Sequence, residues 1–282
     1  MTDWSAWIGR EQRRDDRIDP AAYARWLATI DREAVAEGPV AHGYHWCLAL
    51  PDSPTASLGE DGHPLREPSP DSFLPPVPQT RRMWASSKVE FLGPLRVGAA
   101  IERTSKIASV TGKPGSSGAL VFVDISHETH ADGALAVREV QSLVYRDPPP
   151  AGLPPAPPAL GGANFDAASW DSRRALVPSP ALLFRFSALT FNTHRIHYDL
   201  PYAVEVEGYR GLVVHGPLTA TLLLDLAQRE VGENALNSFS FRGISPAIAG
   251  DMLHLVMRRT GAAFELGAFA SDGREVMRAS AS

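Results

Sequence analysis

The stretch "FNTHRIHYDLPYA", residues 191–203, gathers side chains that can move a proton or bind a metal ion. His194, His197 and Asp199 lie within six residues, and Asn192 stands just before them. A neutral imidazole accepts a proton near pH 7, whereas imidazole and carboxylate together also form metal sites. The stretch therefore predicts acid–base chemistry or a metal site, against the plainer alternative of histidines that cap turns or face water.

Metal binding is the weaker of the two chemical hypotheses. A spacing of three residues brings His194 and His197 together on a helix, but Asn192, Thr193 and Pro201 indicate a loop. His215 adds one possible ligand, and no cluster of Cys or Glu completes a set. We therefore expect no metal.

The stretch "VVHGPL", residues 213–218, supplies a complement to a base. Gly216 precedes Pro217, which suits the first turn of a helix, so its N–H is expected at the positive end of the helix dipole. Such an N–H polarises a carbonyl oxygen. A base that faces this donor can add water across a double bond conjugated to a carbonyl group.

The strings "FSALTFNTHRIHYDLPYA" and "EGYRGLVVHGPL" resemble the MaoC-like (R)-specific enoyl-CoA hydratase/dehydratase family. The chain is similar to its two-hotdog branch of mesaconyl-CoA and itaconyl-CoA hydratases and 3-hydroxyacyl-thioester dehydratases. Because "RRMWASSKVEFLGPLRVG" and "GSSGALVFVDISHE" are similar to the first half of that branch, the resemblance covers nearly the whole chain. It implies an α+β double hotdog, two curved antiparallel sheets each wrapping a central helix.

The resemblance assigns His197 to the position of the catalytic histidine and Gly216 to that of the oxyanion glycine. Asn192 stands five residues before His197, where the wider family has a catalytic aspartate. His194 and Arg195 stand where an Asn and a Pro are expected. We expect His197 to transfer protons and Asn192 to hold water or substrate. The implied substrate contacts are His194, Arg195, Tyr198, Val214 and His215.

The elements that must position these residues follow a repeated order of helix and strands. Asp19 as N-cap and Pro20 predict a helix that ends at Gly38, and "GPLTATLLLDLAQRE" predicts an apolar central helix of the second half. We predict strands at "GYHWCLAL" and "ALLFRFSALTF". About five strands follow in each half, and a Pro-x-x-x-Gly turn recurs at Pro94/Gly98 and Pro246/Gly250.

The predicted domains are an N-terminal hotdog without catalytic loop (1–147), a Pro/Gly-rich linker (148–166) and a C-terminal catalytic hotdog (167–282). A Pro-rich surface excursion is predicted at 51–79. A net charge of -5 argues against nucleic-acid or membrane partners. The single Cys47 lies in an apolar run and predicts a buried, inert thiol. With no secretory signal or membrane span, we expect a cytoplasmic protein and leave a homodimer open.

The expected reaction is reversible hydration of an enoyl-CoA thioester, with CoA as part of the substrate and no other cofactor. A C4 dicarboxylyl chain such as mesaconyl-CoA is favoured because Arg195 can meet a second carboxylate. The alternatives are a 3-hydroxyacyl-thioester dehydratase of fatty-acid metabolism and a non-catalytic acyl-CoA-binding subunit. A thioesterase is disfavoured because His215-Gly216-Pro217 offers no carboxylate at the helix start.

Overall fold

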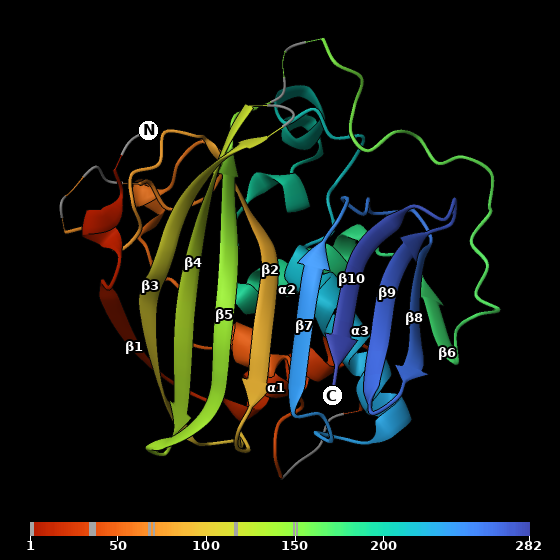
Figure 1. Ribbon diagram of the computed structural model, residues 1–282, viewed down its shortest axis with the longest axis horizontal. Helices are drawn as coiled ribbons and strands as arrows, with labels where there is room; N and C mark the ends of the chain where they lie inside the picture. Colours follow the sequence, from red (N-terminus) through yellow and green to blue (C-terminus); the bar gives the residue numbers. More distant parts are fainter. Residues whose placement is uncertain are drawn as a thin grey trace.

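Figure 1 shows the computed structural model of the chain, a single curved antiparallel sheet with helices on one side of it. The structure describes residues 3–33, 38–66, 69, 71–115, 118–148, 150 and 152–282. Within them ten strands follow the order β1-β3-β4-β5-β2-β7-β10-β9-β8-β6. Strand β2 (Arg81–Phe91) pairs with β7 (Ser238–Gly243), so the two halves join edge to edge as predicted.

The other elements of the first half are η1 (Ser5–Trp7), β1 (Glu11–Arg17), α1 (Pro20–Thr29), η2 (Tyr44–Cys47), η3 (Thr55–Ser57), β3 (Ala100–Gly115), β4 (Gly118–Ala131) and β5 (Ala134–Arg146). Those of the second half are β6 (Ser172–Leu176), α2 (Pro180–Thr190), η4 (Arg195–His197), η5 (Tyr202–Val206), α3 (Gly216–Val231), β8 (Leu253–Thr260), β9 (Ala263–Ala270) and β10 (Glu275–Ala281). The described residues of the predicted linker contain neither helix nor strand and run along the outside of the second half.

Helix α1 begins as predicted but ends early. The Asp19 carboxylate accepts a hydrogen bond from Ala22 N at 2.7 Å, and Pro20 occupies the first turn. The helix ends at Thr29 rather than at Gly38, because the chain leaves helical geometry at Ile30 and Asp31 has a positive φ of 58°. The predicted helical positions Ala34 and Val35 lie outside the described residues.

Two predicted strands are wrong. The segment "ALLFRFSALTF" forms most of helix α2, whose N-cap Ser179 accepts from Leu182 N at 3.1 Å ahead of Pro180. This Ser-Pro start repeats the Asp-Pro start of α1, a local signal that outweighs the apolar run. The segment "GYHWCLAL" forms the 3₁₀ turn η2, in which Tyr44 packs edge-on against Trp26 of α1 with ring centroids 5.6 Å apart.

Helix α3 is the predicted central helix of the second half. It is buried from Leu218 to Gln228 and contacts strands of its own half together with β2. Among the described residues, the first half has no helix of comparable length. Its α1 packs against α2 instead. The sheet therefore consists of two similar halves as predicted, but among the described residues only the second half wraps a long helix.

The two halves repeat the same turn. Gly98 and Gly250 have positive φ angles of 85° and 91°, a conformation that favours glycine. Gly98 N donates to Ile18 O at 2.8 Å, and Gly250 N donates to Pro178 O at 2.9 Å. Each acceptor immediately precedes the N-cap of α1 or α2, so the repeat predicted from the two turns extends to the helices.

Two further observations bear on the exclusions made from the sequence. Cys47 is buried as predicted, and burial raises the pKa of its thiol, so it is not a ready nucleophile. None of the described helices combines the length and the apolar character that crossing a bilayer requires.

Candidate active site

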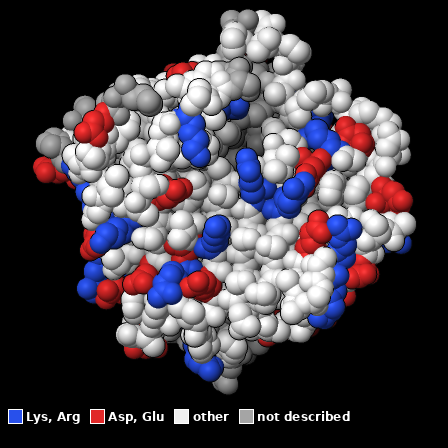
Figure 2. All heavy atoms as spheres, in the orientation of Figure 1, with Lys and Arg blue, Asp and Glu red and all other residues white. Residues whose placement is uncertain are grey.

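A large cavity lies between the sheet of the first half and the segments that connect α2 to α3. Its volume is about 1890 Å³, more than a drug-sized ligand fills. Although the chain carries a net charge of -5, the cationic side chains Arg14, Arg66, Arg82, Arg103, Lys113, Arg146 and Arg242 line it, against the acidic Asp124 and Glu139. Figure 2 shows a hollow above β2 and β7 with basic side chains beside it. This lining suits an elongated anionic ligand.

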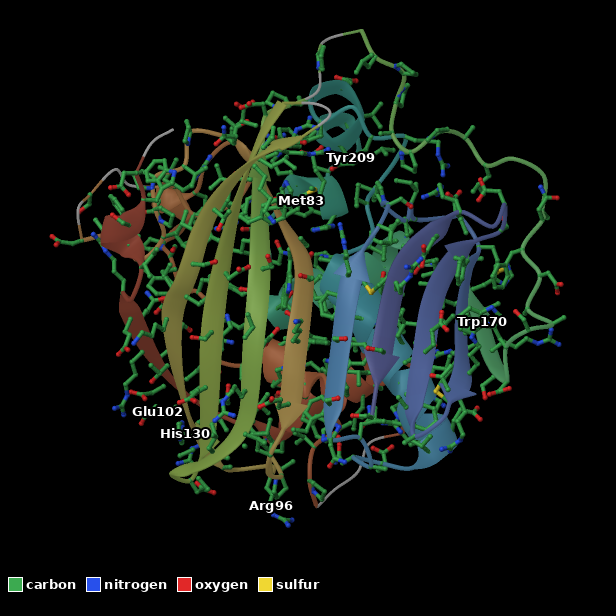
Figure 3. All side chains as sticks on the ribbon, viewed as in Figure 1. Met83, Arg96, Glu102, His130, Trp170 and Tyr209 are labelled. Carbon is green, nitrogen blue, oxygen red and sulfur yellow. The ribbon has the colours of Figure 1, made fainter. Side chains whose placement is uncertain are left out.

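The segment that carries the candidate histidines is held over this cavity from two sides. A small apolar cluster of Ile196, Tyr202, Ala203, Tyr209, Val213 and Ile248 packs beneath it. Arg81 of β2 pairs with Glu207 at 2.8 Å, and both side chains are 9 % exposed. Tyr209 and Met83 both line the cavity, and Figure 3 labels both near the upper end of β2.

His197 has the hydrogen bonding of a neutral base. Its Nδ1 lies 2.7 Å from Val213 O, so this nitrogen carries the proton and donates it to the carbonyl. Its Nε2 is thereby left as an acceptor. Burial lowers the pKa of His197 to about 4, although the bond to Val213 opposes this shift. The imidazole lines the cavity and is neutral at physiological pH.

His215 joins this base to the start of α3. The two imidazoles stack with centroids 3.6 Å apart, and His215 Nε2 lies 2.9 Å from Ser187 Oγ. Burial holds the pKa of His215 well below its usual value. Gly216, the first residue of α3, also lines the cavity, and Pro217 after it has no N–H. The predicted pairing of an imidazole with a helix N-terminus is thus present, and Val214 lines the same wall.

Asn192 and His194 also line the cavity, but the loop limits what Asn192 can do. Helix α2 ends at Phe191 with a positive φ of 49°, which turns the chain toward the cavity. Asn192 Oδ1 accepts from His194 N at 3.0 Å, so its amide N–H₂ is the group left for a ligand. The loop thus presents a hydrogen-bond donor to the cavity at this position.

Arg195 and Tyr198 do not line the cavity, in contrast to the prediction that they contact substrate. Arg195 binds Asp199 Oδ2 through two nitrogens at 2.9 and 2.7 Å and lies over the Tyr202 ring. Tyr198 Oη donates to Thr193 O at 3.0 Å. Because Asp199 is paired with Arg195, the metal set of His194, His197 and Asp199 considered from the sequence is not assembled.

Two residues of the Pro-rich excursion, predicted to lie on the surface, reach the site instead. His63 lines the cavity, and its Nδ1 lies 2.8 Å from Asp61 Oδ2. The His63 and His194 rings are 4.2 Å apart. Asp61, His63 and His194 also form a group whose ligand atoms lie within 4.8 Å of one another. The only local signal was "EDGHP" itself, because its partner lies far along the chain.

The sequence model of hydroxyacyl-thioester dehydratase type 2 matches residues 43–249, most of the chain and both walls of the cavity. The chain belongs to this family. As a member of the hydroxyacyl-thioester dehydratases, it is a hydro-lyase.

Relatives of this dehydratase agree in sequence and in fold. Mesaconyl-C(4)-CoA hydratase of Chloroflexus aurantiacus is 40% identical over 98% of this chain and 96% of its own. A MaoC-like dehydratase of Phytophthora capsici superposes with a TM-score of 0.73 at 13% identity, covering 99% of this chain and 98% of that one. A Mycobacterium tuberculosis protein with a double hotdog fold superposes with a TM-score of 0.56 at 14% identity over 97% and 95%. The predicted double hotdog is therefore confirmed.

Proposed function

We propose that this dehydratase adds water reversibly to an enoyl-CoA thioester, with a branched C4 dicarboxylyl substrate such as mesaconyl-C4-CoA as the first candidate. The observation that carries the reaction is the neutral His197, with Nε2 free, stacked on the residue that precedes the helix start at Gly216. The substrate class is supported by the relative named mesaconyl-C(4)-CoA hydratase.

In the hydration direction His197 Nε2 takes a proton from water, and the hydroxyl oxygen bonds to the β-carbon. The electron pair of the double bond moves toward the thioester, and the enolate oxygen accepts a hydrogen bond from Gly216 N–H. Asn192 donates from its amide to the water or the thioester oxygen. A proton then returns to the α-carbon to give the 3-hydroxyacyl thioester. We propose no metal or redox cofactor, since the thioester carbonyl takes the electrons.

Arg82 replaces Arg195 as the candidate partner for a second carboxylate. Arg195 is engaged by Asp199, whereas Arg82 lines the cavity. Burial and then the charge of Arg82 lower the pKa of His63, which places the guanidinium near the histidines. A guanidinium pairs with a carboxylate through two parallel hydrogen bonds, which an ammonium cannot do.

The test is the loss of the enoyl-thioester ultraviolet band with mesaconyl-C4-CoA and with crotonyl-CoA. We expect hydration of the first, and in Arg82→Gln a fall in kcat/KM at least tenfold larger for mesaconyl-C4-CoA than for crotonyl-CoA. Equal effects on the two substrates would remove Arg82 from carboxylate recognition. No loss of the band with either would favour a non-catalytic acyl-CoA-binding subunit.

A 3-hydroxyacyl-thioester dehydratase of fatty-acid metabolism is the second candidate. The family description and a cavity that extends under the first-half sheet, where Phe122, Ile125 and Leu143 line it, support a longer acyl chain. Dehydration of 3-hydroxyacyl-CoA substrates with four to twelve carbons separates the candidates. A kcat/KM that rises steadily with chain length and exceeds that for the C4 dicarboxylate favours the second.

A further inference from the structure

The loop residues that line the cavity include no carboxylate, and Asn192 is an amide. An amide does not exchange protons usefully, so the proton-transferring groups that the loop presents to the cavity are His197 and His194. Burial, the largest cause, lowers the pKa of His194 to about 2, so it is a poor proton donor or acceptor on its own. Addition of water to a double bond needs one proton removed from water and one delivered to carbon. A second acid–base group is therefore chemically useful at this cavity.

We propose that Asp61 and His63, from the Pro-rich excursion of the first half, form this second acid–base pair, with His63 as a catalytic residue and Asp61 as a positioning residue. The inference rests on the proposed hydratase function and deepens it. His63 lines the cavity beside His194, and their ring centroids are 4.2 Å apart. The ring centroids of His194 and His197 are 5.5 Å apart. The three imidazoles therefore follow one wall of the cavity.

The excursion is fixed against the catalytic loop by contacts that leave little freedom. Thr193 Oγ1 donates to Gly62 O at 2.5 Å, a contact between residues 131 positions apart. Arg195 N donates to Asp61 O at 2.9 Å, and Arg195 Nη1 donates to Glu60 O at 3.0 Å. A Cβ on Gly62 would lie 1.9 Å from Thr193 O, so only glycine permits this approach. Arg195, which does not reach the cavity, thus holds the excursion in place.

The hydrogen bonding within the pair selects one tautomer. Asp61 Oδ2 accepts from His63 Nδ1 at 2.8 Å, and Asp61 Oδ1 accepts from His63 N at 2.9 Å. Burial raises the pKa of Asp61, but its bonds with His63 outweigh this and lower the pKa to about 2, so the carboxylate is charged. Burial and then the charge of Arg82 lower the pKa of His63 more than Asp61 raises it, so the resting imidazole is neutral. A charged carboxylate on Nδ1–H orients this imidazole and leaves Nε2 to accept and deliver the second proton.

The proton balance of the step is complete within the protein. In hydration, neutral His197 takes one proton from water as the C–O bond forms at the β-carbon. The proton passes from His197 through His194 or through water to His63 Nε2. His63 then gives it to the α-carbon as the enolate collapses and the C–H bond forms, which restores both groups. Dehydration runs the same transfers in reverse.

A metal ion on Asp61, His63 and His194 is the competing use of the same residues, since their ligand atoms lie within 4.8 Å of one another. Charges of both signs surround the group. After burial, the positive charge of Arg82 lowers the pKa of His63 and opposes a divalent cation, whereas the Asp61 carboxylate attracts one. The Asp–His pair leaves one imidazole nitrogen free toward the cavity, a geometry suited to proton transfer, and Zn²⁺ titration distinguishes the two uses.

The experiment compares His63→Gln and Asp61→Asn with wild type and His197→Gln in the hydration assay. His130→Gln is the matched control, because His130 lies at the opposite end of the sheet in Figure 3. We expect kcat to fall about 10²-fold or more in His63→Gln and about tenfold in Asp61→Asn, with KM changed less than threefold. Added imidazole should restore part of the rate of His63→Ala and should leave the rate of His130→Ala unchanged.

A second pair of variants tests the contact that positions the pair against the catalytic loop. Gly62→Ala and Gly98→Ala impose the same strain, since the φ angles are 86° and 85°, but only Gly62 faces another residue within 4 Å. Gly62→Ala should lower kcat at least tenfold, while Gly98→Ala should keep the wild-type kcat.

Wild-type kcat in both His63→Gln and Gly62→Ala, with His197→Gln inactive, would overturn the proposed Asp61–His63 pair and leave the hydratase function unaffected. Stoichiometric Zn²⁺ binding that His63→Gln abolishes would overturn it in favour of a metal site. Inactivity of wild type on every enoyl-CoA would overturn the proposed function itself.

Discussion

The two halves share a strand order and a turn, yet they fill their concave faces differently. In the second half α3 occupies this space, and the facing strand residues such as Leu255, Leu266 and Ala268 are fully buried and apolar. In the first half the same space is the cavity, and the strands present Arg103, His127, Glu139 and Gln141 to it. The second half thus forms a packed core that positions the start of α3, and the first half forms a cavity lined by polar side chains.

The polar residues of the first half are partnered rather than merely exposed. The buried Glu139 accepts from Trp46 Nε1 at 3.2 Å and Ser87 Oγ at 2.5 Å, and burial raises the pKa of its carboxyl group. His127 Nδ1 lies 2.7 Å from Ser105 Oγ. Hydrogen-bonded polar groups of this kind maintain a shaped wall without a helix behind it. In this chain, polar pairs on the strands therefore form the cavity wall that no long helix covers.

The largest effect should come from a histidine of the second half. His197→Gln should reduce kcat/KM by about 10²–10⁴-fold through loss of the general base. His42 lies in the equivalent segment of the first half, where Val40 N donates to Leu95 O as Val214 N donates to Ala247 O in the second half. His42→Gln should change kcat/KM by less than twofold. Steady-state hydration kinetics measure both. Equal losses would contradict the assignment of the general base to the second half.

The next largest effect should be on the free energy of unfolding, at the contact between the two halves around Asp225. This α3 carboxylate is 1 % exposed and pairs with Arg32 from the first half at 3.2 Å and with Arg174 and Arg229. Removing this buried charge weakens three ion pairs at once, although Arg32 keeps Glu233 and Arg174 keeps Asp31. Asp225→Asn should therefore lower the free energy of unfolding by about 2–4 kcal/mol. The exposed pair at Glu275 is the control, and Glu275→Gln should cost under about 1 kcal/mol in the same urea titration.

Acid should destabilise both halves through buried neutral histidines. Burial holds the pKa of His45 in the first half and of His215 in the second well below the usual value. The unfolded chain binds more protons below its pKa of about 6.5, so stability is present above that pH and is lost as the pH falls. Between pH 7 and 5 each should contribute on the order of 1–2 kcal/mol to the loss.

Urea titrations at pH 7, 6 and 5 measure this slope, which His45→Gln and His215→Gln should each reduce. A slope that neither variant changes would show that other groups control acid sensitivity.

The smallest effect tests the repeat itself. Gly98→Ala and Gly250→Ala place a side chain at the equivalent left-handed position of each half, and nothing lies within 4 Å of either added Cβ. The two variants should therefore lose the same free energy of unfolding, about 1 kcal/mol each, from backbone strain alone. A difference above about 0.5 kcal/mol in matched thermal or urea unfolding would break the equivalence of the turns.

Local signals in the sequence predicted a large part of this arrangement. Asp19-Pro20 and Gly216-Pro217 located two helix starts, because caps and first-turn prolines act within a few residues. The spacing of His197 before "VHGPL" placed both on one cavity wall, as the resemblance implied. The strand prediction for 181–191 is wrong because an apolar run does not distinguish a buried helix from a strand. The Ser179-Pro180 start is the local signal that favours the helix.

The sequence by itself determined the family, the double fold and a histidine placed next to a helix N-terminus. Only the tertiary structure decided which charged groups face the cavity. Arg195 turns to Asp199, while Arg82 and the Asp61–His63 pair reach the cavity wall from the first half. Caps and turn residues are fixed by neighbours a few positions away, but the direction of a side chain over a cavity is fixed by contacts such as Thr193 to Gly62, 131 residues apart, which exist only once the sheet has closed.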